Sequence, residues 1–572
     1  MLKRIFIKLN VCVFVFSLFV SSNYSQSLEN NFFTVSMGNT AAANSYKELD
    51  TAFNMLTELG CNYTKCNFNW SRIEPLPGNY YWEETDSVAL LVQQYGISII
   101  AFVPQVGTPF WARKPGSMAG VPNNPQDFTH FIYQILNRYK DSMSIEYVEI
   151  LNEISNGTSN GIEPPFAPLW DTTAVYAAEV TTAVYDTVHA HFPDVKVSSA
   201  SVTQPHGLGD SMTAEDTVKT VFMDAYFSAN PQFDYLSLHD YPHYGPSETG
   251  DFEYATQYNF SNLYRGLLNN YGYANKPIFV TEGALGLGPG VNEQLYAAFL
   301  AQNCIVYYSK KDSTNIISLV KASLANALAG TIGFNIADVS TGERYPAFYA
   351  FKTLKEKLEQ YPEFDGRVDG QPDELYYWAL KFKDENDNSL FVAFAPIQIY
   401  YPNPEQPTPR EFHYTEPQSL MLEVGLNKQA LITQLYGDTT TVYSDNNGHI
   451  FFEVYKEAIF IEMQSTGTSV EEETDGMIPG DFHLYQNYPN PFNPQTTISY
   501  QLPVFSEVSL KVYDILGQEV RTLVNENNSA GYHSVVWNGT DNSGRQVSSG
   551  VYFYYLKAGD EFSQTKKLLL IK

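Results

Sequence analysis

Cysteine is scarce in this chain, with four residues in 572. Cys12 lies in a segment that we expect to be cleaved off, so the mature chain keeps Cys61, Cys66 and Cys304. An odd number of cysteines in an oxidising compartment argues that no disulfide framework holds the fold. Cys61 and Cys66 stand on or beside one predicted strand at an odd offset, so they face opposite sides and should not pair with each other.

Ligand sets for metals are equally sparse. The sequence contains no Cys-x-x-Cys pair and no cluster of histidine and cysteine at the spacing of a zinc site. His239 and His243 lie close together, but two ligands without a third make a weak metal site. We therefore predict that the protein uses no metal and no other cofactor.

Basic residues are few. Lys and Arg total 34 against 63 Asp and Glu, which gives a formal net charge of -29. Nucleic acids and anionic membrane surfaces bind proteins through basic patches, so neither is an expected partner of this chain. Polyanionic substrates are disfavoured for the same reason.

Long apolar runs are absent beyond the N-terminus. There, the basic residues Lys3, Arg4 and Lys8 precede an apolar run over Val11–Val20, and small polar residues follow, as in a secretory signal peptide. The run is too short to span a bilayer. We assign residues 1–27 to a signal peptide and expect a mature chain without a membrane span, soluble outside the inner membrane.

The length of the chain predicts several domains. Between about Phe32 and Leu358, short β-branched or apolar runs alternate with helical patterns, as in an α/β fold with a parallel sheet. Eight such runs match the size of a (β/α)8 TIM barrel, which we place at residues 28–362. The predicted strands are Phe33–Met37, Asn62–Cys66, Ser98–Val103, Tyr147–Leu151, Lys196–Ala200, Tyr235–His239, Pro277–Thr281 and Thr331–Ile336. The predicted helices are Ser45–Leu59, Pro125–Tyr139, Thr173–His191, Glu293–Ser309 and Ile316–Ala329.

After Pro362 the pattern changes to strands without helices, which predicts a β-sandwich at residues 363–463. Residues 464–481 follow as a linker, because Ser, Thr, Gly and the run Glu471–Glu473 cannot bury a core. We expect this linker to be flexible and extended. The predicted sandwich strands are Leu375–Phe382, Ser389–Phe394, Ser419–Val424, Ala430–Gln434 and His449–Glu462.

Residues 482–572 form a separate unit. Val508–Asp514 alternates with period two, and turn signals occur in Trp537–Asp541 and Ser548–Phe553, which predicts a small β-sandwich. These patterns alone fit a carbohydrate-binding module equally well. With Tyr488–Pro494 and the terminal Lys566-Lys567, however, the unit resembles the C-terminal type A sorting domain of the type IX secretion system. The resemblance implies a protein that engages this secretion machinery and is released or held at the outer cell surface.

Two glutamates stand at the ends of predicted strands, where the chemistry of a (β/α)8 barrel is found. Glu153 follows the fourth strand and Glu282 ends the seventh. Hydrolysis of a glycosidic bond with retention needs such a pair, one protonated carboxyl to assist the leaving group and one carboxylate to attack the anomeric carbon. Either glutamate alone is explained as a helix N-cap neighbour or a loop charge. Their joint occurrence at these two strand ends favours a catalytic pair.

This arrangement resembles clan A of the glycoside hydrolases, over about residues 31–463. Members of the clan carry Asn-Glu after strand four and Glu after strand seven. The resemblance implies that Glu153 is the acid/base, that Glu282 is the nucleophile, and that Asn152 binds the 2-hydroxyl of the sugar.

Further residues extend the resemblance to the substrate site. His239 and Tyr241 match the His-x-Tyr of the clan, whose tyrosine contacts the nucleophile. Lys65 stands where the clan usually has an arginine, so a point charge replaces a bidentate fork. The segment Asn69–Pro75 is similar to the one after strand two in members grouped with families 39 and 42.

Tryptophans fall in the loops that should face the substrate. Trp70 and Trp111 follow the second and third predicted strands, and their flat apolar faces could pack on the C–H surfaces of sugars. They could equally anchor the rim of the barrel. We predict that both bind substrate.

Taken together, the sequence predicts a secreted, monomeric glycosidase that cleaves β-linked poly- or oligosaccharides with retention. Two alternatives belong to other classes: a barrel that only binds glycans, and a surface scaffold or adhesin. The pair of glutamates argues against the first, because a binding protein has no need of two like charges held close together. An export domain would suit a surface scaffold or adhesin, although such a domain determines where a protein is delivered and not what it does.

Overall fold

The computed structural model describes residues 31–37, 45–114, 120–153, 170–203, 214–240, 264–283, 292–324, 335–368, 378–395, 397–400, 411–414, 418–426, 428–445, 447–464, 482–485, 487, 490, 492, 494–529 and 531–571. The chain divides into two compact units, Met1–Glu359 with Gln398–His413 and Gln360–Ile397 with Tyr414–Lys572. No helix among the described residues is long and apolar enough to cross a membrane.

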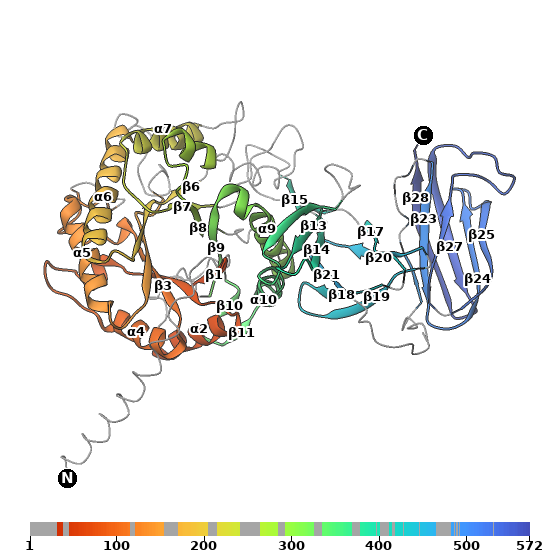
Figure 1. Cartoon of the computed structure of the whole chain (residues 1–572), viewed down its shortest axis with the longest axis horizontal. Helices are drawn as coiled ribbons and strands as arrows, with labels where there is room; N and C mark the ends of the chain where they lie inside the picture. The colour runs from red at the N-terminus through yellow and green to blue at the C-terminus, as the bar shows by residue number, and fades with distance from the viewer. Residues whose placement is uncertain are drawn as a thin grey trace, which may run out of the picture. The chain divides into compact units, whose positions relative to one another are not determined.

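Parallel strands form the sheet of the first unit (Figure 1), in the order β5-β4-β3-β2-β1-β9-β8-β7-β6. β5 and β6 flank a single residue, Ser201, and act as halves of one strand, since β4 pairs with β5 while β7 pairs with β6. A bridge between Ser198 and Tyr235 joins the same seam. The sheet therefore closes as an eight-stranded barrel, which confirms the predicted fold class. Its segments are β1 (Phe33–Ser36), β2 (Tyr63–Asn67), β3 (Ser98–Val103), β4 (Ile145–Ile150), β5 (Lys196–Ala200), β6 (Val202–Thr203), β7 (Leu236–His239), β8 (Ile278–Glu282) and β9 (Ile316–Ser323).

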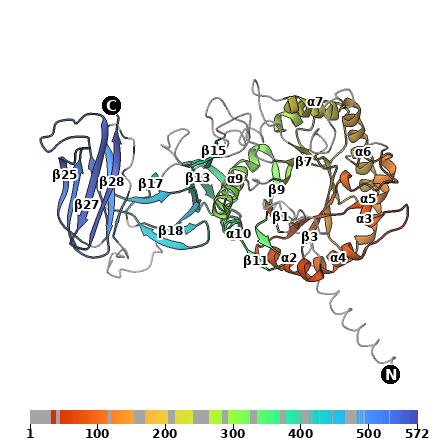
Figure 2. The same ribbon diagram turned by 180° about the vertical axis from the view of Figure 1, so that it is seen from behind.

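Helices surround the barrel strands, as the view from behind also shows (Figure 2). α5 illustrates how the sequence sets them: the Asn124 side chain accepts the Gln126 N–H at the helix start, and Pro125 occupies the first turn. Phe128, Phe131 and other apolar residues of α5 are buried. The helices are α2 (Tyr46–Glu58), α3 (Trp70–Ile73), α4 (Glu83–Tyr95), the 3-10 helix η3 (Gln105–Gly107), α5 (Pro125–Tyr139), α6 (Trp170–His191), α7 (Ala214–Ser228), α9 (Glu293–Thr314) and α10 (Pro346–Leu358); residues 264–270 are also helical.

The eighth barrel strand differs from the prediction. It is β9, Ile316–Ser323, where the sequence pattern predicted a helix over Ile316–Ala329. α9 runs to Thr314, and Asn315 then ends it in the left-handed conformation, with φ 54°. The run that follows is rich in β-branched residues and pairs with both β1 and β8. The predicted strand Thr331–Ile336 lies mostly outside the described residues.

Side chains inside the barrel form layers. Tyr63, Tyr147, Tyr235 and Phe279 belong to one apolar cluster. Residues two positions further along each strand point to the same side. The residues at these positions, one layer nearer the carboxyl ends, are polar: Lys65, Glu149, Ser237 and Thr281.

The second unit begins with a β-sandwich core. Six strands form one antiparallel sheet in the order β12-β13-β14-β21-β18-β19, and β17 pairs with β20. The predicted strand His449–Glu462 is in fact two strands, because the chain leaves its pairing with β17 and then pairs with β14 and β18. The strands are β12 (Glu363–Arg367), β13 (Trp378–Lys383), β14 (Ser389–Phe394), β17 (Gln418–Glu423), β18 (Gln429–Gln434), β19 (Thr439–Tyr443), β20 (His449–Val454) and β21 (Ile459–Gln464). A separate pair, β15 (Ile397–Tyr400) and β16 (Glu411–Tyr414), belongs mostly to the first unit.

The C-terminal residues form a second, smaller sandwich, as predicted. A three-stranded sheet, β22-β23-β26, and a four-stranded sheet, β25-β24-β27-β28, share one core that contains Phe492, Trp537 and Tyr554. The period-two pattern of β24 appears as alternating burial along the strand. The strands are β22 (His483–Leu484), β23 (Thr496–Leu502), β24 (Ser506–Tyr513), β25 (Glu519–Asn528), β26 (Gly531–Trp537), β27 (Gly550–Ala558) and β28 (Phe562–Leu570).

One hairpin loop recurs in the second unit, beginning at Asp384, Asp445, Asp514 and Asp541. In each copy the aspartate Oδ1 accepts the backbone N–H groups two and four residues later, at 2.8 to 3.0 Å. The fourth loop residue has a positive φ in every copy. These residues are Asp387 (φ 62°), Gly448 (85°), Gly517 (76°) and Gly544 (79°).

Asp387 is thus the strained member of this set, which leads to a prediction. Asp387→Gly should raise the free energy of unfolding by about 0.5 to 1 kcal/mol, because glycine adopts the left-handed region without a Cβ penalty. The ion pair with Lys383 adds little, since its atoms are 3.6 Å apart and Asp387 is 88% exposed. Urea unfolding measures the change. Gly517→Asp, at an equally open position, should have the opposite sign, and a loss of stability in Asp387→Gly would contradict the argument.

Candidate active site

A cluster of polar side chains gathers where the barrel strands end. Parallel strands bring their carboxyl ends to one face of a barrel, so residues far apart in the sequence meet there. β2, β4, β7 and β8 supply them directly, and the turn after β4 supplies one more. The cluster consists of Lys65, Glu149, Glu153, His239 and Glu282.

The two predicted glutamates approach the same atom. His239 Nδ1 lies 3.2 Å from Glu153 Oε1 and 3.4 Å from Glu282 Oε2. The two carboxylate oxygens therefore cannot be farther apart than the sum of these distances, about 6.6 Å. His239 is completely buried, whereas the glutamate side chains are 16% and 25% exposed. Both glutamate side chains are thus partly exposed, unlike the imidazole between them.

The turn that carries Glu153 has an unusual backbone. Leu151 and Glu153 have positive φ angles, 57° and 46°, which non-glycine residues rarely adopt. Gln105 holds the residue between them: its Oε1 accepts the Asn152 N–H at 2.5 Å, and its Nε2 donates to the Asn152 carbonyl at 2.7 Å. Ser201 N–H donates to the Leu151 carbonyl. Strain that the surroundings hold in place is common at functional sites.

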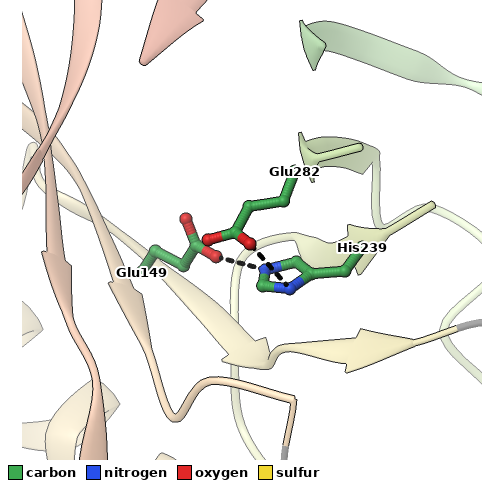
Figure 3. A group of neighbouring side chains, drawn as sticks. All are labelled: Glu149, His239 and Glu282. Atoms are coloured by element: carbon green, nitrogen blue, oxygen red, sulfur yellow. Dashed lines mark hydrogen bonds and ion pairs between the residues drawn. The ribbon is translucent and has the colours of Figure 1, made fainter. Parts of the chain in front are cut away.

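Glu149 is a site residue that the sequence reasoning missed. It is fully buried in β4 and joins two other members of the cluster: Oε2 lies 2.9 Å from Lys65 Nζ, and Oε1 lies 3.0 Å from His239 Nε2. Figure 3 shows its carboxylate and that of Glu282 close together, each facing a different nitrogen of the imidazole. A glutamate at an inward position of a predicted barrel strand was the available signal. Gln105, in the short 3-10 helix η3, gave none.

Hydroxyl groups complete the environment of Glu149. Ser201, Ser237 and Thr281 place their hydroxyl oxygens 2.9, 3.1 and 2.9 Å from Glu149 Oε1. All three residues are fully buried. A buried carboxylate is stable only with such hydrogen bonds and opposite charges around it.

Lys65 connects Glu149 to Glu282. Its ammonium lies 2.7 Å from Glu282 Oε1 and 3.4 Å from the Thr281 carbonyl, in addition to the contact with Glu149. The same ammonium stands 3.8 Å from the ring centre of Phe102. These contacts place the predicted point charge directly against the predicted nucleophile.

The two tryptophans predicted to bind substrate lie in different environments. Trp70 is fully buried, stacks on Phe131 and donates to Glu74 Oε2 at 2.8 Å. A ring with no exposed face cannot pack on a sugar, so Trp70 takes the alternative role of anchoring the rim. Trp111 is partly exposed and meets Trp70 edge to face. Tyr241 lies outside the described residues.

Two family models match parts of the chain. The family model described as beta-galactosidase, of glycoside hydrolase family 42, matches residues 43–119, and that of the FlgD Ig-like domain matches residues 492–561. A family 39 glycoside hydrolase from Bacteroides cellulosilyticus WH2 superposes with a TM-score of 0.53 at 13% identity, covering 77% of this chain and 82% of its own. The barrel has the same fold as that enzyme.

A second structure supports the same fold. A monomeric beta-xylosidase from Caulobacter crescentus CB15 has a TM-score of 0.51 and 13% identity, and the superposition covers 76% of this chain and 97% of that enzyme. No curated protein matches the sequence. The solved structures therefore establish a fold shared with these glycosidases.

Neighbouring charges shift the pKa values of His239 and Glu282. Burial alone would lower the pKa of His239, but the charge of Glu282, followed by hydrogen bonds to Glu149 and Glu153, raises it to about 9. Burial alone would raise the pKa of Glu282, yet the charges of His239 and Lys65 hold it below its ordinary value. At neutral pH the site therefore combines an imidazolium, an ammonium and an ionised Glu282.

The raised pKa of His239 predicts a pH-dependent stability. A folded pKa of about 9 against about 6.5 in the unfolded chain stabilises the fold fully below pH 6.5, and this contribution is lost as the pH rises through 9. The shift corresponds to roughly 3 kcal/mol. Denaturant unfolding of wild type and His239→Gln should differ most near pH 6 and least near pH 9.5. A difference that stays constant over this range would contradict a charged His239.

The same residues bear on metal binding. Glu149, His239 and Glu282 offer ligand atoms that all lie within 4.8 Å of one another. Lys65 Nζ, however, lies 2.9 and 2.7 Å from the two carboxylates and so occupies the place that a cation would need. A fixed ammonium serves here as the positive charge between the carboxylates.

Proposed function

We propose that the protein is a retaining glycoside hydrolase that cleaves β-glycosidic bonds of poly- or oligosaccharides. The observation that carries the proposal is the approach of Glu153 and Glu282 to one imidazole nitrogen, with their oxygens at most about 6.6 Å apart. Retaining enzymes hold their carboxyl groups about 5 to 5.5 Å apart, against about 6.5 to 9.5 Å in inverting enzymes, so this upper bound excludes all but the lower end of the inverting range. The strand positions and the fold of family 39 support the same class.

Glu282 is the nucleophile in this proposal. Its lowered pKa keeps it ionised, and it forms a bond to the anomeric carbon while Glu153 gives its proton to the departing glycosidic oxygen. In the second step Glu153 takes a proton from water, the water oxygen bonds to the anomeric carbon, and the bond to Glu282 breaks. Glu153 ends protonated and Glu282 ionised, as at the start.

Asn152 supports substrate binding in the same proposal. Its Oδ1 is buried and has no hydrogen-bond partner among the described residues, so it is available to a sugar hydroxyl. Its backbone is fixed on both sides by Gln105. A preorganised acceptor of this kind would orient the sugar ring over the two glutamates.

The test is hydrolysis by the purified mature chain, residues 28–572. Aryl glycosides and oligosaccharides of gluco, xylo, manno and galacto configuration, all β-linked, form the panel, and NMR of the first product reports its anomeric configuration. The proposal expects a β product from at least one substrate. Glycan binding without hydrolysis would instead favour the non-catalytic alternative, a binding or adhesion protein.

We further propose that the protein is secreted or held at the outer cell surface, with residues 1–27 as signal peptide and 482–572 as sorting domain. The match of residues 492–561 to the FlgD Ig-like domain and the separate hydrophobic core of the C-terminal sandwich support this assignment. Deleting residues 482–572 should leave hydrolysis intact but retain the protein in the periplasm of a host with type IX secretion. Immunoblots of periplasm and medium measure this, and normal export of the truncated chain would overturn it.

A further inference from the structure

His239 stands between carboxylates on both of its nitrogens. Nε2 faces Glu149 Oε1 at 3.0 Å, and Nδ1 faces Glu153 and Glu282 at 3.2 and 3.4 Å. An ionised carboxylate can only accept hydrogen bonds, so a ring nitrogen beside it has to carry a proton. Glu149 thereby fixes the proton on Nε2. Nδ1 is hydrogen-bonded to Glu153 Oε1, and the negative charge of Glu282 Oε2 at 3.4 Å favours a second proton on this nitrogen. The surroundings select a doubly protonated imidazolium.

Glu149 is itself held ionised. Two cations, Lys65 and His239, contact its carboxylate, and three hydroxyl oxygens lie within 3.1 Å of its Oε1. Its side chain is fully buried and so has no contact with a ligand in the barrel mouth. The role of Glu149 is therefore exerted through the residues it holds.

The charges in this layer form a balanced set. Lys65 and His239 supply two positive charges, and Glu149 and Glu282 supply two negative ones. Without the charge of Glu149 one positive charge is left over. Lys65 remains paired with Glu282 at 2.7 Å, so His239 is the group that would lose its proton.

We propose that Glu149 is a positioning residue that fixes the orientation, tautomer and charge of His239, and through His239 the placement of the two glutamates at the barrel mouth. The proposal rests on the proposed function for its catalytic consequence. The effect of Glu149 on the protonation of His239 can be measured whether or not the protein hydrolyses glycosides. Buried carboxylates that orient a functional histidine have large effects on rate in other enzymes.

The experiment compares Glu149→Gln with Glu146→Gln in the mature chain. Glu146 lies on the same strand but accepts from the Tyr63 hydroxyl and has no contact with His239 among the described residues, so it is a matched control. Glu149→Gln should lower kcat by about 10- to 1,000-fold with little change in KM. ¹⁵N NMR of histidine-labelled protein, assigned with His239→Gln, should show the His239 titration midpoint lowered by at least about one pH unit. The control should change neither quantity.

Several outcomes separate the possibilities. An unchanged His239 midpoint in folded Glu149→Gln would overturn the positioning role, whatever the activity. A wild type inactive on every glycoside would refute the proposed function, while the titration would still decide the role of Glu149. If Glu149→Gln does not fold, the paired variant Lys65→Met with Glu149→Gln removes both charges together and should fold. Removal of the Lys65 charge by itself raises the His239 midpoint, so the effect of Glu149 is measured against Lys65→Met. The paired variant should have the lower His239 midpoint of the two, and equal midpoints would overturn the proposal.

Discussion

Glu153→Ala should release a burst of phenol from an aryl glycoside with a good leaving group and then turn over slowly. The nucleophile Glu282 remains and forms the glycosyl-enzyme, but the step that frees it lacks its general base. Azide needs no base, so it should attack the intermediate, speed turnover and yield a glycosyl azide with the configuration of the substrate. Stopped-flow absorbance and NMR of the azide product measure both effects.

Glu282→Ala is the matched variant, because it removes the other carboxylate of the same pair. Turnover should fall by at least about 1,000-fold without a burst, since no covalent intermediate can form. Any azide product should have the opposite configuration. The reverse pattern in the two variants would exchange the roles, and a loss below about 100-fold in both would show that this site is not the catalyst.

Trp70→Ala should destabilise the barrel by about 3 to 5 kcal/mol, because the ring is fully buried and its removal leaves a large cavity. The change also leaves the buried Glu74 carboxylate without the indole donor at 2.8 Å. Thermal unfolding and denaturant titration measure the loss. Trp111→Ala should cost less stability, since that ring is partly exposed.

Kinetics separate the roles of these two tryptophans. Trp70→Phe keeps much of the packing against Phe131 and should leave KM close to that of wild type. If Trp111 contacts substrate, as the sequence predicts, Trp111→Phe should raise KM. A raised KM in Trp70→Phe at full stability would restore Trp70 as a binding residue.

Much of the barrel follows from local patterns. The first seven strands could be predicted because each is a short apolar run between helical segments, and their order places Glu153 and Glu282 at the fourth and seventh strand ends. The positions of His239 and Lys65 follow in the same way. The meeting of these residues is then a property of parallel strands in a closed sheet.

The eighth strand shows where such patterns fail. Ile316–Ser323 contains apolar residues on both faces, so it has no period that separates strand from helix. Asn315, which ends α9 in the left-handed conformation, was the local signal. Pairing with β1 and β8 then decides the conformation of the segment.

Glu149 escaped prediction for a different reason. Residues at strand ends face the barrel mouth, whereas Glu149 lies inside the strand and faces the interior. Its partners come from β2, β7 and β8, and no spacing in the sequence relates them. Only closure of the barrel brings this carboxylate next to Lys65 and His239.

The balance of charges among Lys65, His239, Glu149 and Glu282 constrains how this chain can change over evolution. Replacing Lys65, Glu149 or His239 alone leaves a buried charge without its partner, which is costly, whereas replacing a pair of opposite charges together preserves neutrality. Substitutions at these positions should therefore occur jointly among homologous sequences. Charged residues beneath the barrel mouth would then be replaced together, while residues in the loops around the mouth are replaced one at a time.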